Sequence, residues 1–157
     1  AVGVDAPHHG PREDGWLARF HEANPLEAHG MLLRQVLAAA GEIPRVIDHV
    51  VAEGHGCVGV LGISMGAYTA LAVAAEDTRI RATVSMLGSP DWAPPVLFIN
   101  AGEDVNVPAR FAREFARKAA HPHATYVEYP ESDHFMRAED WADAFGRAVA
   151  FLRLHLS

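Results

Sequence analysis

Short apolar runs alternate with longer amphipathic stretches along this chain, and the alternation predicts strands separated by helices. Each run holds only about four to eight residues and is rich in β-branched or aromatic side chains, which is typical of buried strands. The predicted strands lie at residues 1–5, 58–63, 82–87, 96–100 and 125–129.

Helical patterns occupy the segments between these runs. We expect helices at residues 16–21, 25–51, 67–75, 108–120 and 137–154. The second should begin at Asn24-Pro25, and Pro44 should kink it or split it in two near Gly41, because proline lacks an amide N–H and clashes with the preceding turn. The last helix should bury a stripe of large apolar residues: Trp141, Phe145, Val149 and Leu152.

This alternation predicts an α/β fold in which a doubly wound, mostly parallel sheet lies between two helical layers, giving three layers. With 157 residues and no repeat or linker, the chain should form a single domain over residues 1–157. The net charge of −7 without a basic stripe gives no support for a nucleic-acid partner. No apolar run reaches the roughly 18 residues that span a bilayer, so we expect no membrane partner.

The cysteine and histidine content argues against a metal site. Cys57 is the only cysteine and should be a small buried residue at the head of a strand. Ten histidines are present, but none has the H-x-x-x-H or H-E-x-x-H spacing of a zinc site. We therefore expect no metal and no cofactor.

The junction between the run at 58–63 and the following helix carries the clearest chemical signal. Gly62, Ser64 and Gly66 form a G-x-S-x-G pattern between a strand and a helix. This pattern indicates a nucleophile elbow, in which a sharp turn exposes the serine and leaves no room for a Cβ on the flanking glycines. The alternative is an ordinary turn between a strand and a helix.

A serine hydroxyl needs a base to become a nucleophile, and two later loops offer partners. The loop after the run at 96–100 contains Asp104 and Glu103, and the loop after the run at 125–129 contains His134 and Asp133. Both loops follow the carboxyl ends of predicted parallel strands, where Ser64 should also lie. Asp104 is the preferred acid, with Glu103 and Asp133 as alternatives, and His134 is the preferred base over His121 and His123.

Four motifs in order resemble the α/β-hydrolase superfamily, and they extend over nearly the whole chain. Three are Gly62-Ile-Ser-Met-Gly66, Gly102-Glu-Asp-Val-Asn-Val-Pro108 and Ser132-Asp-His-Phe135. The fourth, Asp5-Ala-Pro-His-His-Gly-Pro-Arg12, is similar to a loop of the small esterase and dienelactone-hydrolase-like members.

The resemblance implies catalytic roles for Ser64 as nucleophile, Asp104 as orienting acid and His134 as general base. It also implies that the backbone N–H of Met65 is an oxyanion donor. His9 and Arg12 are expected to organise their loop rather than to take part in catalysis. Trp92, Val107 and Phe135 are expected at the substrate pocket.

The chain departs from the family pattern at its beginning. The family has further strands before the position of Ala1, one of which lies beside the elbow strand and is followed by an H-G loop with a second oxyanion donor. We therefore expect an N-terminally incomplete fold. Upstream residues, re-pairing of residues 1–5 or strand exchange with a second copy, giving a homo-oligomer, could fill the gap; we favour upstream residues.

Together these features favour a serine hydrolase that cleaves a small carboxylic ester through an acyl-enzyme. A peptidase or lactone hydrolase could use the same three residues, and a non-catalytic remnant or binding module is the rival from another class. The short connection at 88–95 argues against a helical lid over the site. The sequence does not identify a compartment, and a cytoplasmic location is the default expectation.

Overall fold

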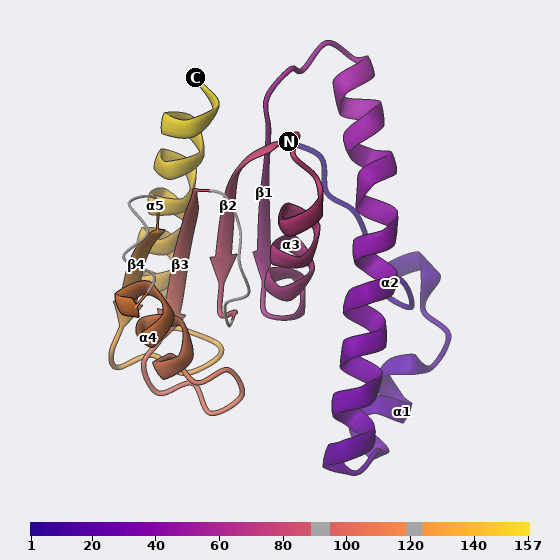
Figure 1. Ribbon diagram of the computed structural model, residues 1–157. Coiled ribbons are helices and arrows are strands. Elements are labelled where there is room, and N and C mark those ends of the chain that lie inside the picture. The colour runs from indigo at the N-terminus through magenta and orange to yellow at the C-terminus, as the bar shows by residue number, and fades with distance from the viewer. Residues whose placement is uncertain (89–94, 119–123) are drawn as a thin grey trace.

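The computed structural model describes residues 1–88, 95–118 and 124–157. Its centre is a four-stranded parallel sheet in which the spatial order of the strands follows their order in the chain (Figure 1). The strands are β1 (Val58–Ile63), β2 (Ile80–Met86), β3 (Val96–Ala101) and β4 (Ala124–Tyr129). Four of the five predicted strands are thus confirmed.

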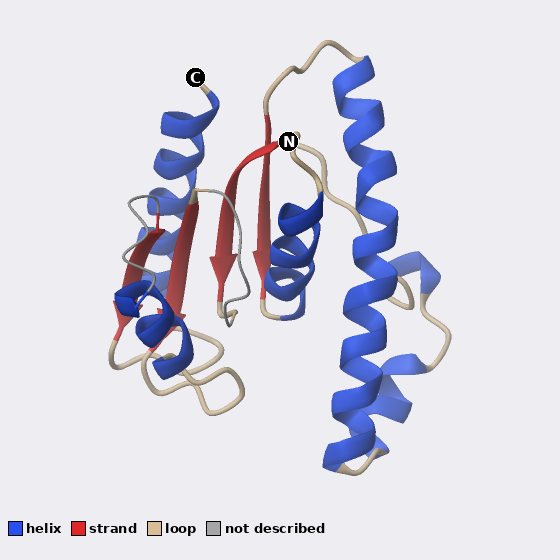
Figure 2. Cartoon of the chain, in the orientation of Figure 1, coloured by secondary structure: helices blue, strands red, loops and turns tan. Residues whose placement is uncertain are grey.

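Helices cover both faces of this sheet, which gives the predicted three layers (Figure 2). The helices are η1 (Gly10–Arg12), α1 (Trp16–Glu22), α2 (Pro25–Ala52), α3 (Met65–Glu76), α4 (Arg110–Lys118) and α5 (Ala138–Leu156). On one face α3 packs on β1 and β2 while α4 packs on β4, and α2 packs against α3. On the other face α5 packs across β1, β2 and β3.

A separate apolar core fills the space on each side of the sheet. Phe98 on β3 is fully buried between the sheet and the helices α2, α3 and α4, and its ring meets Phe115 edge to face at 5.7 Å. The neighbouring Ile99 points to the opposite core, beneath α5. Continuous apolar sequence in β3 therefore reflects burial on both faces, as in other parallel sheets.

The buried stripe of α5 differs from the predicted one. Ala144 and Ala148 are fully buried against the sheet, whereas Phe145 and Val149 are each 43% exposed. Trp141 and Leu152 do pack at the edge of this core. Phe145 and Val149 each lie about 100° around the helix from the alanine that precedes them, and the small size of these two alanines lets the helix backbone approach the sheet closely.

The long helix α2 is continuous, so the predicted split near Gly41 is wrong. Ile43 and Ile47 lie on either side of Pro44 and pack into the same core, which holds both parts of the helix in line. The predicted start is confirmed: Asn24 caps the helix by accepting hydrogen bonds from the backbone N–H groups of Leu26 and Glu27, both at 3.1 Å.

Two predictions about the ends of elements are also wrong. Residues 1–5 are exposed and form no strand, because no neighbouring strand in the described part of the chain pairs with them. Cys57 is exposed rather than buried, since β1 begins one residue later at Val58. Among the described residues β1 pairs only with β2, so its other edge carries no strand.

None of the helices that the structure describes combines the length and the apolar character that crossing a membrane requires.

Candidate active site

The turn between β1 and α3 holds Ser64 in a strained backbone conformation. Its φ and ψ are 51° and −117°, a region that residues with a Cβ rarely occupy. The Ser64 N–H donates to the carbonyl of Met86 at 2.9 Å, and the Ser64 carbonyl accepts from Ala67 N–H at 2.9 Å. The turn is thereby attached to both β2 and α3, and the Ser64 side chain lies at the junction of strand and helix.

The two flanking glycines of this turn differ in what they permit. A Cβ on Gly62 would lie 1.9 Å from the carbonyl oxygen of Gly66, a distance that backbone atoms do not tolerate. A Cβ on Gly66 would meet no described atom within 4 Å. The prediction that both positions exclude a side chain therefore holds for Gly62 alone.

We expect Gly62→Ala to destabilise the fold strongly and Gly66→Ala to leave stability unchanged or slightly increased. The first substitution forces strand and helix apart, and such core strain costs about 1–3 kcal/mol or more. The second replaces a glycine in the first turn of α3 by a better helix former. Urea unfolding of both variants measures the difference, and equal losses of stability would contradict this reading of the turn.

Ser64, His134 and Asp104 form one hydrogen-bonded chain, although they come from three separate loops. Ser64 Oγ lies 3.0 Å from His134 Nε2, and His134 Nδ1 lies 2.7 Å from Asp104 Oδ2. The Asp104 side chain has no exposed surface, while that of His134 is 19% exposed. The carboxyl ends of β1, β3 and β4 thus bring together the three residues that the sequence singled out.

The Asp104 carboxylate is held in place from its other oxygen. Asp104 Oδ1 accepts hydrogen bonds from the backbone N–H groups of Asn106 and Val107, both at 2.8 Å. A carboxylate that accepts two backbone donors and one imidazole N–H has little freedom to rotate. These bonds hold Oδ2 facing His134.

The loops that carry Asp104 and His134 are also joined through their backbones. Glu103 N–H donates to the carbonyl of Ser132 at 2.9 Å, and Gly102 N–H donates to that of Tyr129 at 2.8 Å. Gly102 has no room for a side chain, because a Cβ would lie 2.6 Å from the carbonyl oxygen of Pro130. The two loops consequently form one rigid support for the imidazole.

The alternative acids occupy other positions. Glu103 is exposed, and its contact with the histidine loop runs through its backbone. Asp133 is exposed as well, and its Oδ1 accepts from Phe135 N–H at 2.8 Å within a local turn. His121 and His123, the alternative bases, lie outside the described residues.

A buried cluster beneath the histidine loop was not found from the sequence. Ser132 is 1% exposed, and its Oγ donates to Asp140 Oδ2 at 2.5 Å. Arg137 Nε donates to the same Asp140 oxygen at 3.0 Å. The hydrogen bond from Ser132 and the nearby Arg137 guanidinium both hold the pKa of the Asp140 carboxyl below its ordinary value. The cluster attaches the start of α5 to the loop that presents His134.

We expect Asp140→Asn to lower stability at neutral pH and to weaken the dependence of stability on acid. Because the folded-state pKa of Asp140 is lowered, its contribution is present above the unfolded-state value of about 3.9 and is lost as the pH falls through the lowered value. Urea unfolding midpoints recorded between neutral pH and about pH 3 measure this loss of stability. Glu139→Gln, which changes an exposed neighbouring residue, is the control. A variant whose midpoints fall in parallel with those of the parent would contradict the role of Asp140.

The residues predicted at the substrate pocket fall into three situations. Phe135 is 77% exposed, and its ring meets that of His134 edge to face at 5.9 Å. Val107 is only 7% exposed, so its main contact with the site is its N–H bond to Asp104. Trp92 lies outside the described residues. Of the two that the structure describes, Phe135 has the more apolar surface available beside the imidazole.

The N-terminal loop is organised by the two residues expected to do so. His9 Nδ1 lies 2.9 Å from the carbonyl oxygen of Pro7. Arg12 forms a bidentate ion pair with Glu42 of α2, with both distances 2.7 Å.

Within residues 1–88, 95–118 and 124–157, no group of three or more His, Cys, Asp or Glu side chains is arranged to hold a metal ion.

The parallel sheet between helical layers, with a serine on a strand-to-helix turn, defines the fold class as that of the α/β hydrolases. The model of the dienelactone hydrolase family matches residues 28–150, and the chain belongs to this family. No curated protein matches the sequence.

Solved structures of similar fold include three hydrolases. A cold-adapted esterase from an Arctic intertidal metagenomic library has a TM-score of 0.70 and 24% identity over 98% of this chain and 68% of its own. A putative dienelactone hydrolase from Klebsiella pneumoniae has a TM-score of 0.65 and 19% identity over 75% of this chain and 61% of its own. A Xanthomonas campestris protein described as an α/β serine hydrolase without a lid has a TM-score of 0.62 and 22% identity over 74% of this chain and 56% of its own.

These identities are too low to carry more than the fold. The chain spans less than two thirds of the length of the K. pneumoniae and X. campestris proteins.

Proposed function

We propose that this protein is a serine hydrolase that cleaves small carboxylic esters through an acyl-enzyme on Ser64. The observation that carries the proposal is the hydrogen-bonded chain from Ser64 through His134 to the buried Asp104. This is the arrangement that activates a serine hydroxyl at neutral pH. Membership of the dienelactone hydrolase family supports the same class of reaction.

In the first half of the reaction Ser64 Oγ attacks the ester carbonyl carbon while His134 Nε2 takes the hydroxyl proton. The 3.0 Å separation of these atoms is within the range for direct proton transfer. Asp104 keeps the proton on His134 Nδ1 and stabilises the imidazolium that forms. The imidazolium then gives its proton to the departing alcohol oxygen, which leaves an acyl group on Ser64.

The oxyanion that develops on the carbonyl oxygen needs hydrogen-bond donors. Met65 is the first residue of α3. Its N–H therefore belongs to the first turn of the helix, where backbone N–H groups have no acceptor within the helix. Aimed at the oxyanion, one such donor is worth on the order of 3 kcal/mol in the transition state. In the second half of the reaction His134 activates a water molecule, which hydrolyses the acyl-enzyme and restores Ser64.

The size of the substrate follows from what surrounds the serine. The connection from β2 to β3 covers only residues 87–95, which is too short to fold over a long acyl chain. Phe135 offers exposed apolar surface beside His134, suited to a short acyl or alcohol group. We therefore expect p-nitrophenyl acetate to be hydrolysed with a higher kcat/KM than p-nitrophenyl palmitate, and the reverse order would contradict this substrate class.

Hydrolysis of p-nitrophenyl acetate also tests the proposed class of reaction. Turnover by the parent chain that is lost on substitution of Ser64 supports a serine hydrolase. A folded chain without turnover on acetate, butyrate or a small lactone would instead indicate a non-catalytic binding module. Cleavage of a peptide but of no ester would indicate a peptidase using the same three residues.

A further inference from the structure

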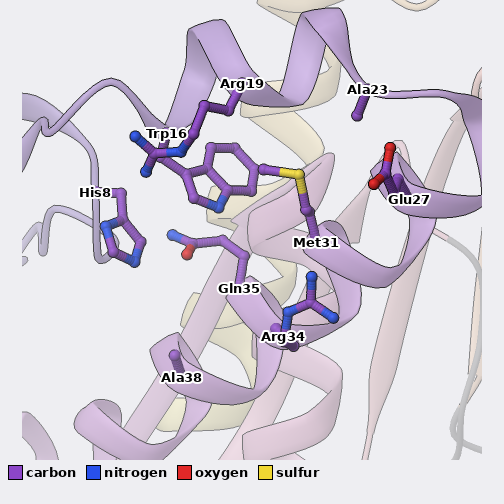
Figure 3. A pocket seen from close by; sticks show the side chains of 9 residues that line it. All are labelled: His8, Trp16, Arg19, Ala23, Glu27, Met31, Arg34, Gln35 and Ala38. Atoms are coloured by element: carbon purple, nitrogen blue, oxygen red, sulfur yellow. The ribbon is translucent and has the colours of Figure 1, made fainter.

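A cavity of about 570 Å³ lies between α1 and α2, on the side of α2 that faces away from the sheet (Figures 1 and 3). None of its lining residues belongs to the hydrogen-bonded chain of Ser64, His134 and Asp104. Its walls come from the N-terminal loop, α1 and the first half of α2. The cavity is therefore separate from the candidate active site, and its lining residues indicate which chemical groups a ligand would need.

One wall of this cavity is flat and apolar. The indole of Trp16 stacks on Phe20 at 5.1 Å with an interplanar angle of 13°, and it stacks on His8 at 6.3 Å with an angle of 10°. These contacts fix the plane of the indole, which is only 8% exposed. Met31 lies beside it in Figure 3 and adds a polarisable, adaptable surface. The remaining exposed indole surface and Met31 together form an apolar wall against which an aromatic ring can pack.

The opposite wall carries a cation that has no counter-ion among the described residues. Arg34 is an exposed residue of α2 that makes no hydrogen bond or ion pair with any described residue. Its guanidinium lies over Gly30, where a Cβ would be 3.5 Å from Arg34 Nη1. The acidic side chain on this rim, Glu27, is already bonded to Asn24 Nδ2 at 2.9 Å. A guanidinium presents several N–H donors in one plane, which matches a carboxylate.

A second guanidinium stands on the α1 side of the cavity. Arg19 donates to the carbonyl oxygen and the carboxylate of Asp14 at 3.1 and 3.4 Å. Asp14 already pairs with Arg19, and the Glu27 carboxylate also borders the cavity, so Arg34 is the cation left to pair with an anionic ligand.

The floor of the cavity holds a glutamine side chain that is largely buried. Gln35 is 2% exposed, and its Nε2 donates to the carbonyl oxygen of Pro7. Its Oε1 accepts no hydrogen bond from the described residues, although the side chain borders the cavity in Figure 3. Oε1 is not among the buried polar atoms that lack a partner in the described part of the chain, so this oxygen is open to the cavity, where a hydroxyl or N–H group of a ligand can donate to it.

We infer that this cavity, which we call the α1–α2 pocket, binds a small aromatic carboxylate that also carries a hydroxyl or N–H donor. The ring lies along Trp16, the carboxylate pairs with Arg34, and the donor reaches Gln35 Oε1. An inorganic anion would leave the indole wall unused, and a neutral aromatic compound would leave Arg34 unpaired. The site does not depend on the hydrolase proposed above.

The test uses 4-hydroxyphenylacetate as the probe and the Trp16 indole N–H signal in ¹H–¹⁵N NMR spectra as the readout. Trp16→Phe identifies that signal among those of the three tryptophans. We expect saturable shifts of the Trp16 signal with a dissociation constant of roughly 1 mM or tighter. Arg34→Gln should raise that constant at least about tenfold, because the ligand's charge-assisted hydrogen bonds are lost. Arg45→Gln, an exposed arginine of the same helix outside the pocket, should leave it unchanged.

Two related probes separate the groups of the ligand. We expect 4-hydroxyphenylacetamide to bind at least about tenfold more weakly, because it lacks the charge that pairs with Arg34. We expect 4-methoxyphenylacetate to bind more weakly as well, because it has no donor for Gln35. Absence of saturation, equal binding by the acetamide, or equal losses in the Arg34 and Arg45 variants would each overturn the inference. Shifts confined to Trp141 would place the ligand elsewhere and overturn it too.

Discussion

Ser64→Ala should reduce kcat for p-nitrophenyl acetate by roughly 10⁴-fold or more, the scale on which serine hydrolases lose activity without their nucleophile. Removing Oγ leaves His134 without the hydroxyl that lies 3.0 Å from its Nε2. Binding of the ester should change little, because the residues around the turn remain. Steady-state kinetics on the purified variant measures the loss, and turnover within a few-fold of the parent would rule out Ser64 as the nucleophile.

A matched substitution at the same position separates activity from backbone strain. Ser64→Gly also removes the hydroxyl, but glycine adopts a φ of 51° without the steric cost that a Cβ imposes. We therefore expect the glycine variant to be as inactive as the alanine variant and more stable by about 1 kcal/mol in urea unfolding. A glycine variant that is no more stable than the alanine variant would show that the turn stores no strain.

Asp104→Asn should reduce kcat by about 10⁴-fold, although the amide has nearly the same shape as the carboxylate. The carboxylate accepts from His134 Nδ1 at 2.7 Å and from two backbone N–H groups on its other oxygen. An amide that keeps the backbone bonds must turn its NH₂ group towards His134, which favours the imidazole tautomer with a protonated Nε2. That tautomer cannot accept the Ser64 proton.

Asp133→Asn is the control for this substitution. Asp133 is exposed and accepts a hydrogen bond only within its local turn, so kcat should stay within a few-fold of the parent. A larger loss in the Asp133 variant than in the Asp104 variant would move the acid to the histidine loop.

Local sequence was sufficient to predict the parallel sheet and the three loops that supply the hydrogen-bonded chain. The strands are short apolar runs, and parallel strands place their carboxyl ends at one edge of the sheet. The loops that follow β1, β3 and β4 were therefore expected to meet, and they offered a serine, a pair of acids, and a histidine beside a further acid. The resemblance to the α/β hydrolases then decided between Asp104 and its neighbour Glu103.

Features that depend on contacts distant in the sequence were less predictable. On α5 the stripe of large side chains suggested burial of Phe145 and Val149, but close approach of the helix to the sheet requires the small Ala144 and Ala148. Pro44 suggested a break, yet Ile43 and Ile47 anchor both parts of α2 to one core.

The support for the histidine loop was unpredictable for a related reason. Serine and aspartate at positions 132 and 140 are ordinary residues for a loop and a helix start. Only the fold buries Ser132 and brings its hydroxyl to Asp140. The stacked wall of the α1–α2 pocket likewise depends on how the N-terminal loop and α1 pack on α2.

Labelling with a fluorophosphonate tests the central claim most directly, because such reagents form a stable adduct with a serine only when a neighbouring base activates it. Intact-protein and peptide mass spectrometry should show one adduct per chain, located on Ser64, with labelling much slower in Asp104→Asn and absent in Ser64→Ala. A folded chain that gains no adduct, or gains it on a serine other than Ser64, would contradict the assignment of Ser64 as the activated nucleophile.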